Sequence, residues 1–161
     1  MTDYKVFVKD FVERTLHNLE FLEKKHESGQ YEVYEFTQLV NSLLGLLVIP
    51  QQREYNRIDD SFIDEQILEK LQGAIVRNDY ARESNSHNNF KIILKHMRNA
   101  IAHGRLDFAG KNNVISQITF KDKSRHKIPR FFVISMDIEI LREFVNDFAQ
   151  KLLQKNLNHE F

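Results

Sequence analysis

The sequence predicts a mainly α-helical fold: a bundle of four to five helices with a β-hairpin inserted before the last helix. Glycine (5) and proline (2) are scarce among the 161 residues, which favours long helices over all-β folds with many turns. Apolar residues recur at helical spacing in most segments, and one stretch in the C-terminal half has the period of strands instead. The length suits one domain, so we expect a single domain over residues 1–161.

Two long helices are predicted in the N-terminal part of the chain. The first has one apolar face and ends near Ser28. The second begins near Tyr31, and its segment Leu43–Ile49 is apolar all round except for Gly45. Such a segment lies in the core or against another subunit, and we expect Pro50 to end the helix.

A third and a fourth helix are predicted next. Asp60 or Ser61 caps the third helix, which ends at Gly73 or shortly after it. A polar loop leads to the fourth helix, which begins near Asn88 or Asn89 and ends before Gly104, a residue suited to the position after a last helical turn. The expected core stripe of this helix consists of Phe90, Ile93, Leu94, Met97 and Ile101.

The spacing of the apolar residues changes from that of a helix to that of strands after the fourth helix. Val114–Phe120 and Arg130–Ser135 are rich in β-forming residues, and the charged stretch Lys121–Pro129 between them is typical of a turn. This pattern predicts a β-hairpin. A last amphipathic helix is expected from about Asp137.

The composition excludes several classes of site. There is no cysteine, which rules out disulfides, cysteine-bound zinc, iron–sulfur clusters and thiol nucleophiles. No glycine-rich phosphate loop is recognisable and no histidine pair has metal-ligand spacing, so we expect neither a cofactor nor a metal. No signal peptide and no apolar run of roughly 18 residues is present, so we expect a cytoplasmic protein with no membrane partner.

The charges are balanced in number but not in position. Lysine plus arginine and aspartate plus glutamate count 23 each. Residues 70–131 hold 13 basic and 4 acidic residues, a net charge of +9, whereas residues 1–69 carry −7 and residues 132–161 carry −2. This basic region is either a patch for an anionic partner or is neutralised by the flanking segments. Within it, Lys121–Lys127 (KDKSRHK) is either an RNA-gripping hairpin tip or a solvated turn.

Residues 95–105 (KHMRNAIAHGR) combine side chains suited to phosphate chemistry. On an ideal helix, His96, Asn99 and His103 share a face that points away from the apolar stripe, and Arg98 lies at its border. Histidine titrates near neutral pH, and arginine binds phosphate through two parallel hydrogen bonds. RNA cleavage without a metal needs two proton transfers and a cation for the phosphorane. One histidine is too few for both transfers, and two-fold pairing of this face would supply a second.

The segment Arg98–His103 (RNAIAH) resembles the R-x4-6-H motif of the HEPN superfamily, including the polar residue after the arginine. Gly104-Arg105-Leu106, the hairpin and the last helix are similar to the stand-alone bacterial branch, and Asn41–Pro50 resembles its second-helix segment. The resemblance implies a HEPN-like helical bundle that dimerises through its motif helices. It also implies a metal-independent endoribonuclease of toxin–antitoxin, stress or antiphage systems.

The same resemblance assigns roles to the motif residues. Arg98 would hold the scissile phosphate and stabilise the phosphorane, and His103 would be the general base or acid. Asn99 would orient His103 or the phosphate. The implied products carry 2′,3′-cyclic phosphate and 5′-hydroxyl ends. Three neighbouring side chains are expected to contact RNA: Lys95, His96 and Arg105.

We expect a homodimer, because Leu43–Ile49, Ile92 and Ile101 offer more apolar surface than one core needs. RNA is the expected ligand, and an antitoxin protein is a further candidate partner. Two other interpretations stay open. A non-catalytic HEPN module would dock a nucleotidyltransferase-type antitoxin, another protein or a nucleotide. An unrelated helical protein with an accidental motif would have Arg98 paired with an acid.

Overall fold

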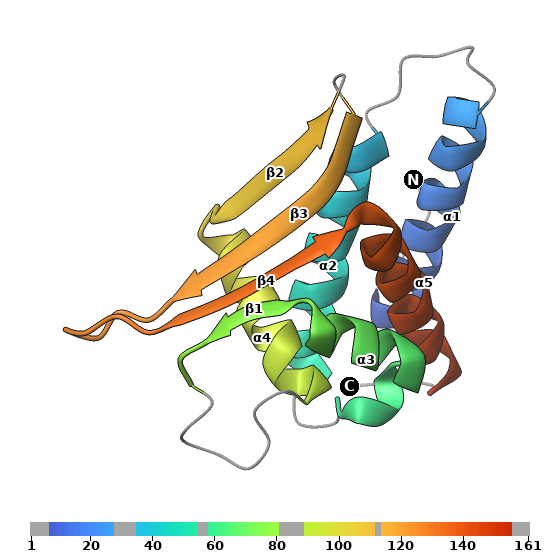
Figure 1. Ribbon diagram of the computed structural model, residues 1–161. Helices are drawn as coiled ribbons and strands as arrows, with labels where there is room; N and C mark the ends of the chain where they lie inside the picture. Colours follow the sequence, from blue (N-terminus) through green and yellow to red (C-terminus); the bar gives the residue numbers. More distant parts are fainter. Residues whose placement is uncertain (1–6, 28–34, 55–57, 81–88, 112–113, 156–161) are drawn as a thin grey trace. The chain divides into compact units, whose positions relative to one another are not determined.

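The computed structural model describes residues 7–27, 35–54, 58–80, 89–111 and 114–155, which contain five α-helices and four strands (Figure 1). In chain order the elements are α1 (Phe7–Glu27), α2 (Glu35–Glu54), the 3-10 turn η1 (Asp60–Phe62), α3 (Glu65–Gly73), β1 (Ile75–Asn78), α4 (Phe90–Ala102), β2 (Leu106–Lys111), β3 (Val114–Lys123), β4 (Phe131–Asp137) and α5 (Ile138–Gln154). The predicted start of the second helix lies outside the described residues.

The chain divides into two compact units. Unit 1 consists of residues 1–57 and 145–161, and therefore contains α1, α2 and the later turns of α5. Unit 2 consists of residues 58–144 and contains every element from η1 to the first turns of α5. All of the candidate site residues belong to unit 2.

In unit 1, α1 and α2 bury apolar side chains at helical spacing. Gly45 of α2 lies against the ring of Phe11, where an added Cβ atom would overlap the ring, so the glycine lets the two helices approach closely. The expected stop at Pro50 is wrong, because α2 continues to Glu54. Proline removes one intrahelical hydrogen bond, and the burial of the preceding leucines outweighs that loss. The buried residues of α1 and α2 include Val12, Leu19, Leu39, Leu43, Leu46 and Leu47.

Unit 2 contains a four-stranded antiparallel sheet with the strand order β1-β4-β3-β2 (Figure 1). The expected hairpin is present as β3 and β4, with Gln117 opposite Asp137 and Lys123 opposite Phe131. The sequence pattern does not predict β1 and β2, which flank this hairpin. The fold is therefore mixed α/β, and the expectation of a mainly α-helical bundle with one inserted hairpin is wrong.

The two unexpected strands carry little side-chain signal. β1 has four residues, too few to establish a period. In β2, five of the six residues are exposed, so apolar and polar positions do not alternate. β2 forms because its backbone pairs with the buried strand β3, from Leu106 opposite Phe120 to Lys111 opposite Val114. Edge pairing of this kind depends on backbone hydrogen bonds more than on side-chain pattern.

Helix α4 covers one face of the sheet and contacts β3 (Figure 1). Two side chains fix its start. Asn89 accepts a hydrogen bond from the N–H of Ile92 (3.0 Å), as expected of a cap, and Asp60 accepts one from the N–H of Phe90 (2.7 Å). Asp60 therefore satisfies the start of α4 and does not cap α3, whose N-cap is Asp64.

Candidate functional site

The exposed face of α4 differs from the expected one. His96 is only 6% exposed and Asn99 is half-buried, because β3 packs against the side of the helix that was expected to be open. The outward stripe instead carries Lys95, the half-buried Arg98 and Ala102. His96 therefore lies where it cannot touch RNA directly in this conformation. A projection of one helix cannot anticipate a sheet that covers its second face.

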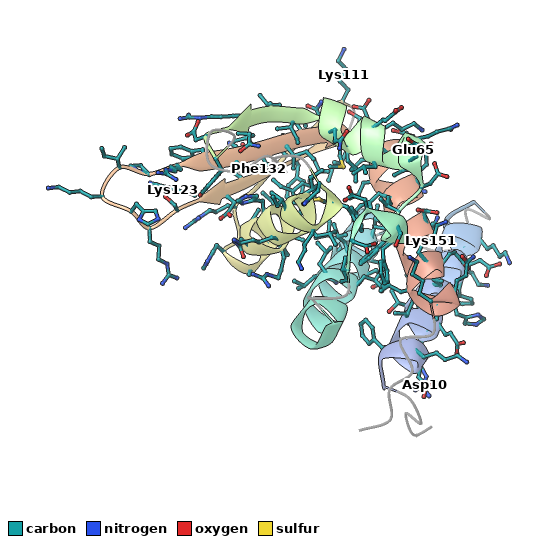
Figure 2. The ribbon with its side chains drawn as sticks, turned by 90° about the horizontal axis from the view of Figure 1, so that it is seen from below. Asp10, Glu65, Lys111, Lys123, Phe132 and Lys151 are labelled. Atoms are coloured by element: carbon teal, nitrogen blue, oxygen red, sulfur yellow. The ribbon has the colours of Figure 1, made fainter. Side chains whose placement is uncertain are left out.

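His96 forms a buried pair with Asp122 of β3. The His96 Nδ1 and Asp122 Oδ2 atoms are 2.7 Å apart, and the two side chains are 7% and 8% exposed. Burial raises the pKa of Asp122, but the hydrogen bonds from His96 and Asn99 outweigh burial and hold that pKa below its usual value. An ionised carboxylate can only accept, so Nδ1 of His96 carries the hydrogen. The ring of Phe132, labelled in Figure 2, stacks on the imidazole with centroids 4.3 Å apart.

Asp122 also anchors the polar part of the motif. Asn99 Nδ2 donates to Asp122 Oδ2 (3.0 Å), and Asn99 Oδ1 accepts a hydrogen bond from Arg98 Nη2 (2.9 Å). This series of hydrogen bonds fixes one nitrogen of the Arg98 guanidinium. Within the described residues no carboxylate forms an ion pair with Arg98, which argues against an accidental motif. The remaining guanidinium N–H groups are available to an anion.

His103 lies at the C-terminal end of α4, and its side chain is exposed. Its backbone N–H donates to the carbonyl of Asn99 (3.1 Å), and Gly104, with φ +61°, then turns the chain toward β2. The Asn99 side chain binds Arg98 and Asp122, so it does not orient the His103 of the same chain. No other side chain in the described ranges bonds to the His103 imidazole, which is therefore open to a ligand.

Arg105 and Lys95 differ in how much of each side chain is left to bind a ligand. Arg105 Nη1 donates to the carbonyl of Lys123 (3.1 Å) and lies 3.9 Å from Asp122 Oδ1, so part of this guanidinium holds β2 and β3 in place. Its side chain is still 35% exposed. Lys95 is exposed on the same stripe as Arg98. The structure thus brings Arg98 and Arg105 to the two sides of one buried carboxylate.

Asp122 was not predicted from the sequence, and the structure places it at the centre of the site. The signal was present: Ile118, Phe120 and Asp122 alternate with polar residues, so all three lie on one face of a strand. Ending the predicted strand at Phe120 assigned Asp122 to a turn. In β3 the strand continues to Lys123, and the Asp122 side chain is buried.

The described residues contain neither a metal-binding cluster nor a membrane-spanning helix. No group of three or more histidine, cysteine, aspartate or glutamate side chains there is arranged to hold a metal ion. No helix in the same ranges is both long and apolar enough to cross a membrane.

Comparison with known families shows which family model the chain matches. A family model described as HEPN pEK499 p136 matches residues 1–159. Neither the curated proteins nor the solved structures contain a significant match. The match covers almost the whole chain, including both units and the motif segment of α4.

Proposed function

The chain belongs to the HEPN pEK499 p136 family, and from this membership we propose that it is a metal-independent endoribonuclease with Arg98 and His103 as its catalytic residues. One observation carries the proposal. The Arg98 guanidinium is held by Asn99, which is itself held by the buried Asp122, and no acid neutralises it within the described residues. An arginine fixed in this way, on the same helix as an exposed histidine, suits the recognition of a phosphodiester.

In the proposed reaction Arg98 binds the two non-bridging oxygens of the scissile phosphate. Only Nη2 is used by Asn99, so other N–H groups remain for the phosphate. As the 2′-oxygen attacks phosphorus, negative charge grows on the phosphorane, and a fixed guanidinium stabilises that charge without reorganising. Asn99 and Asp122 are positioning residues, because they act through Arg98.

His103 supplies the proton transfers. One imidazole removes the proton from the 2′-hydroxyl, a bond forms from the 2′-oxygen to phosphorus, and the bond to the 5′-oxygen breaks. A second, protonated imidazole donates a proton to the leaving 5′-oxygen. The products are a 2′,3′-cyclic phosphate and a 5′-hydroxyl end. Since each chain has one His103, the second imidazole comes from a second copy in a homodimer.

Two other cations, one in α4 and one just before β2, fit an RNA ligand. Lys95 lies beside Arg98 on the exposed stripe, and Arg105 retains exposed surface next to the same network. Both are placed to contact phosphates flanking the scissile one, where they would add affinity without selecting a sequence.

The test is an RNA cleavage assay in the presence of EDTA. Wild-type protein is compared with Arg98→Ala, His103→Ala and the control Lys151→Ala, which changes a cation of unit 1. We expect the wild type and the control to cut RNA at similar rates. Each motif substitution should lower the rate by about a hundredfold or more. Equal cleavage by all four proteins would refute the proposal, and no cleavage by any of them would favour a non-catalytic binding module.

A further inference from the structure

The hairpin formed by β3 and β4 ends in a segment whose charged residues are all basic. Residues 123–130 (KSRHKIPR), here called the basic arm, contain four lysines and arginines and no acidic residue. Lys123, Arg125, His126 and Lys127 are exposed, and the apolar Ile128 is 82% exposed. Within unit 2 the arm projects beyond the ends of β1 and β2 (Figure 1), and Lys123 lies at its base (Figure 2). Such a projection buries little surface of its own, so folding alone does not explain it.

Contacts at the base of the arm close the hairpin there. The N–H of Ser124 donates to the carbonyl of Arg130 (2.9 Å), and the Ser124 hydroxyl accepts the N–H of Arg130 (3.0 Å). The next pair of the hairpin is Lys123 and Phe131, and the Lys123 ammonium lies 5.7 Å from the centre of the Phe131 ring. Because its two ends are joined, the arm has less conformational entropy to lose on binding a ligand than an open loop of the same length.

Three acidic residues of unit 2 are already engaged. Asp79 forms a two-point ion pair with Arg77, and Asp107 pairs with Lys121. Asp122 is buried and occupied by His96 and Asn99. In the described part of the chain no carboxylate pairs with Lys123, Arg125 or Lys127. Arg130, the fourth cation of the arm, interacts electrostatically with Asp79. The other three cations are not neutralised by an ion pair within the described residues, and they suit a polyanionic ligand.

The base of the arm adjoins the candidate catalytic network. Lys123 follows Asp122 in the chain, and its carbonyl accepts a hydrogen bond from Arg105. Asp122 is linked through Asn99 to Arg98. Arg98, Arg105 and the base of the arm therefore belong to one connected set of contacts around Asp122. This continuity favours a phosphodiester chain over an acidic protein, which would need no contact with Arg98.

We propose that the basic arm binds the phosphodiester backbone of the RNA strand beside the scissile phosphate. The proposal rests on the proposed function, because it extends the RNA-binding surface from Arg98 outward. The arm supplies affinity and positions the strand, and it takes no part in proton transfer. Its contacts are with phosphates, so they are independent of base sequence and sensitive to salt.

The experiment measures binding of a fluorescein-labelled single-stranded RNA of mixed sequence by anisotropy at several salt concentrations. All proteins carry His103→Ala, so that the probe stays intact. The arm variant is Lys123→Gln/Arg125→Gln/Lys127→Gln. The matched control, Lys9→Gln/Lys24→Gln/Lys155→Gln, removes the same charge from exposed residues of unit 1.

We expect the arm variant to bind about tenfold more weakly near 0.1 M salt and to lose about two units of the slope of log K against log salt. The control should change affinity by less than about twofold. An arm variant that binds like its parent, or a control that weakens binding equally, would overturn the proposal. If the His103→Ala parent does not bind RNA, the proposal is overturned as well. It is also overturned if the arm binds an acidic protein and not RNA.

Cleavage is measured separately with His103 intact. If the arm variant binds weakly while the wild type cuts no RNA, the proposed function fails and the arm still binds RNA. If the wild type cuts RNA and the arm variant cuts it equally well at low RNA concentration, the arm proposal fails and the proposed function stands.

Discussion

At the scale of single residues, the site depends on one buried carboxylate. Asp122 accepts hydrogen bonds from His96 and Asn99, and Asn99 in turn holds Arg98. A buried ionic group of this kind is costly to desolvate, and it is tolerated because every contact is satisfied. We expect the network both to contribute to the stability of unit 2 and to orient the guanidinium. These two effects can be separated by experiment.

The substitution Asp122→Asn should lower RNA cleavage by about tenfold, because Asn99 and Arg98 lose a charged anchor and the guanidinium becomes less well placed. Circular dichroism should show that the variant stays folded. The decisive comparison is a double-mutant cycle with Arg98→Ala. If Asp122 acts through Arg98, adding Asp122→Asn to Arg98→Ala changes cleavage no further. An equal additional loss in that background would contradict the positioning role.

The pH dependence of stability tests the same carboxylate. The pKa of Asp122 is lowered by folding, so its stabilising contribution is fully present above the unfolded pKa of about 3.9. It is lost as the pH falls through the lower pKa of the folded state. The difference in unfolding free energy between the wild type and Asp122→Asn should therefore be constant at neutral pH and shrink below about pH 4. Urea titrations across this range measure it, and a difference that persists in strong acid would contradict the assignment.

At the scale of elements, the turn from α4 to β2 determines where α4 ends and therefore where His103 lies. Gly104 has φ +61°, a conformation that costs other residues about 1–2 kcal/mol. An added Cβ atom would meet no neighbour there, so any penalty arises from the backbone alone.

Gly104→Ala should lower the free energy of unfolding by about 1–2 kcal/mol in chemical denaturation. Gly73, at the end of α3, is a matched control because a Cβ atom there also meets no neighbour and its φ is not positive. Gly73→Ala should be neutral or stabilising, since alanine favours helix by up to about 1 kcal/mol. Equal effects of the two substitutions would show that the left-handed turn is not what the glycine provides.

The elements also show how far sequence reasoning reaches. The cap at Asn89, the turn at Gly104, the hairpin and the last helix follow from local chemistry, and the structure contains each of them. The strand β2 depends on a partner strand that lies next along the chain, and its own side chains carry no pattern. The motif residues Arg98 and His103 were identifiable from their spacing. The burial of His96 could not be predicted from the sequence, because only the fold shows that β3 covers this side chain.

At the scale of the whole molecule, the proposed mechanism requires two copies of the chain. Ala102 is exposed on the stripe of α4 that also carries Arg98, and its small side chain permits close approach of a second helix. Ala102→Gln keeps helix propensity high and retains both motif residues.

Ala102→Gln should shift the protein from dimer toward monomer in sedimentation velocity and lower specific cleavage activity in parallel, by about tenfold or more at dilute protein. Dilution of the wild type should lower its specific activity in the same way. A monomeric wild type with full activity would contradict the shared site, and so would a variant that is monomeric and fully active.

The most direct test of the proposed mechanism is the chemistry of the RNA ends. Total RNA is incubated in EDTA with the wild type or with His103→Ala, and the new ends are identified. The mechanism predicts 2′,3′-cyclic phosphate and 5′-hydroxyl ends with the wild type, and intact RNA with His103→Ala. Ends carrying a 5′-phosphate, or the same cyclic ends from His103→Ala, would contradict it.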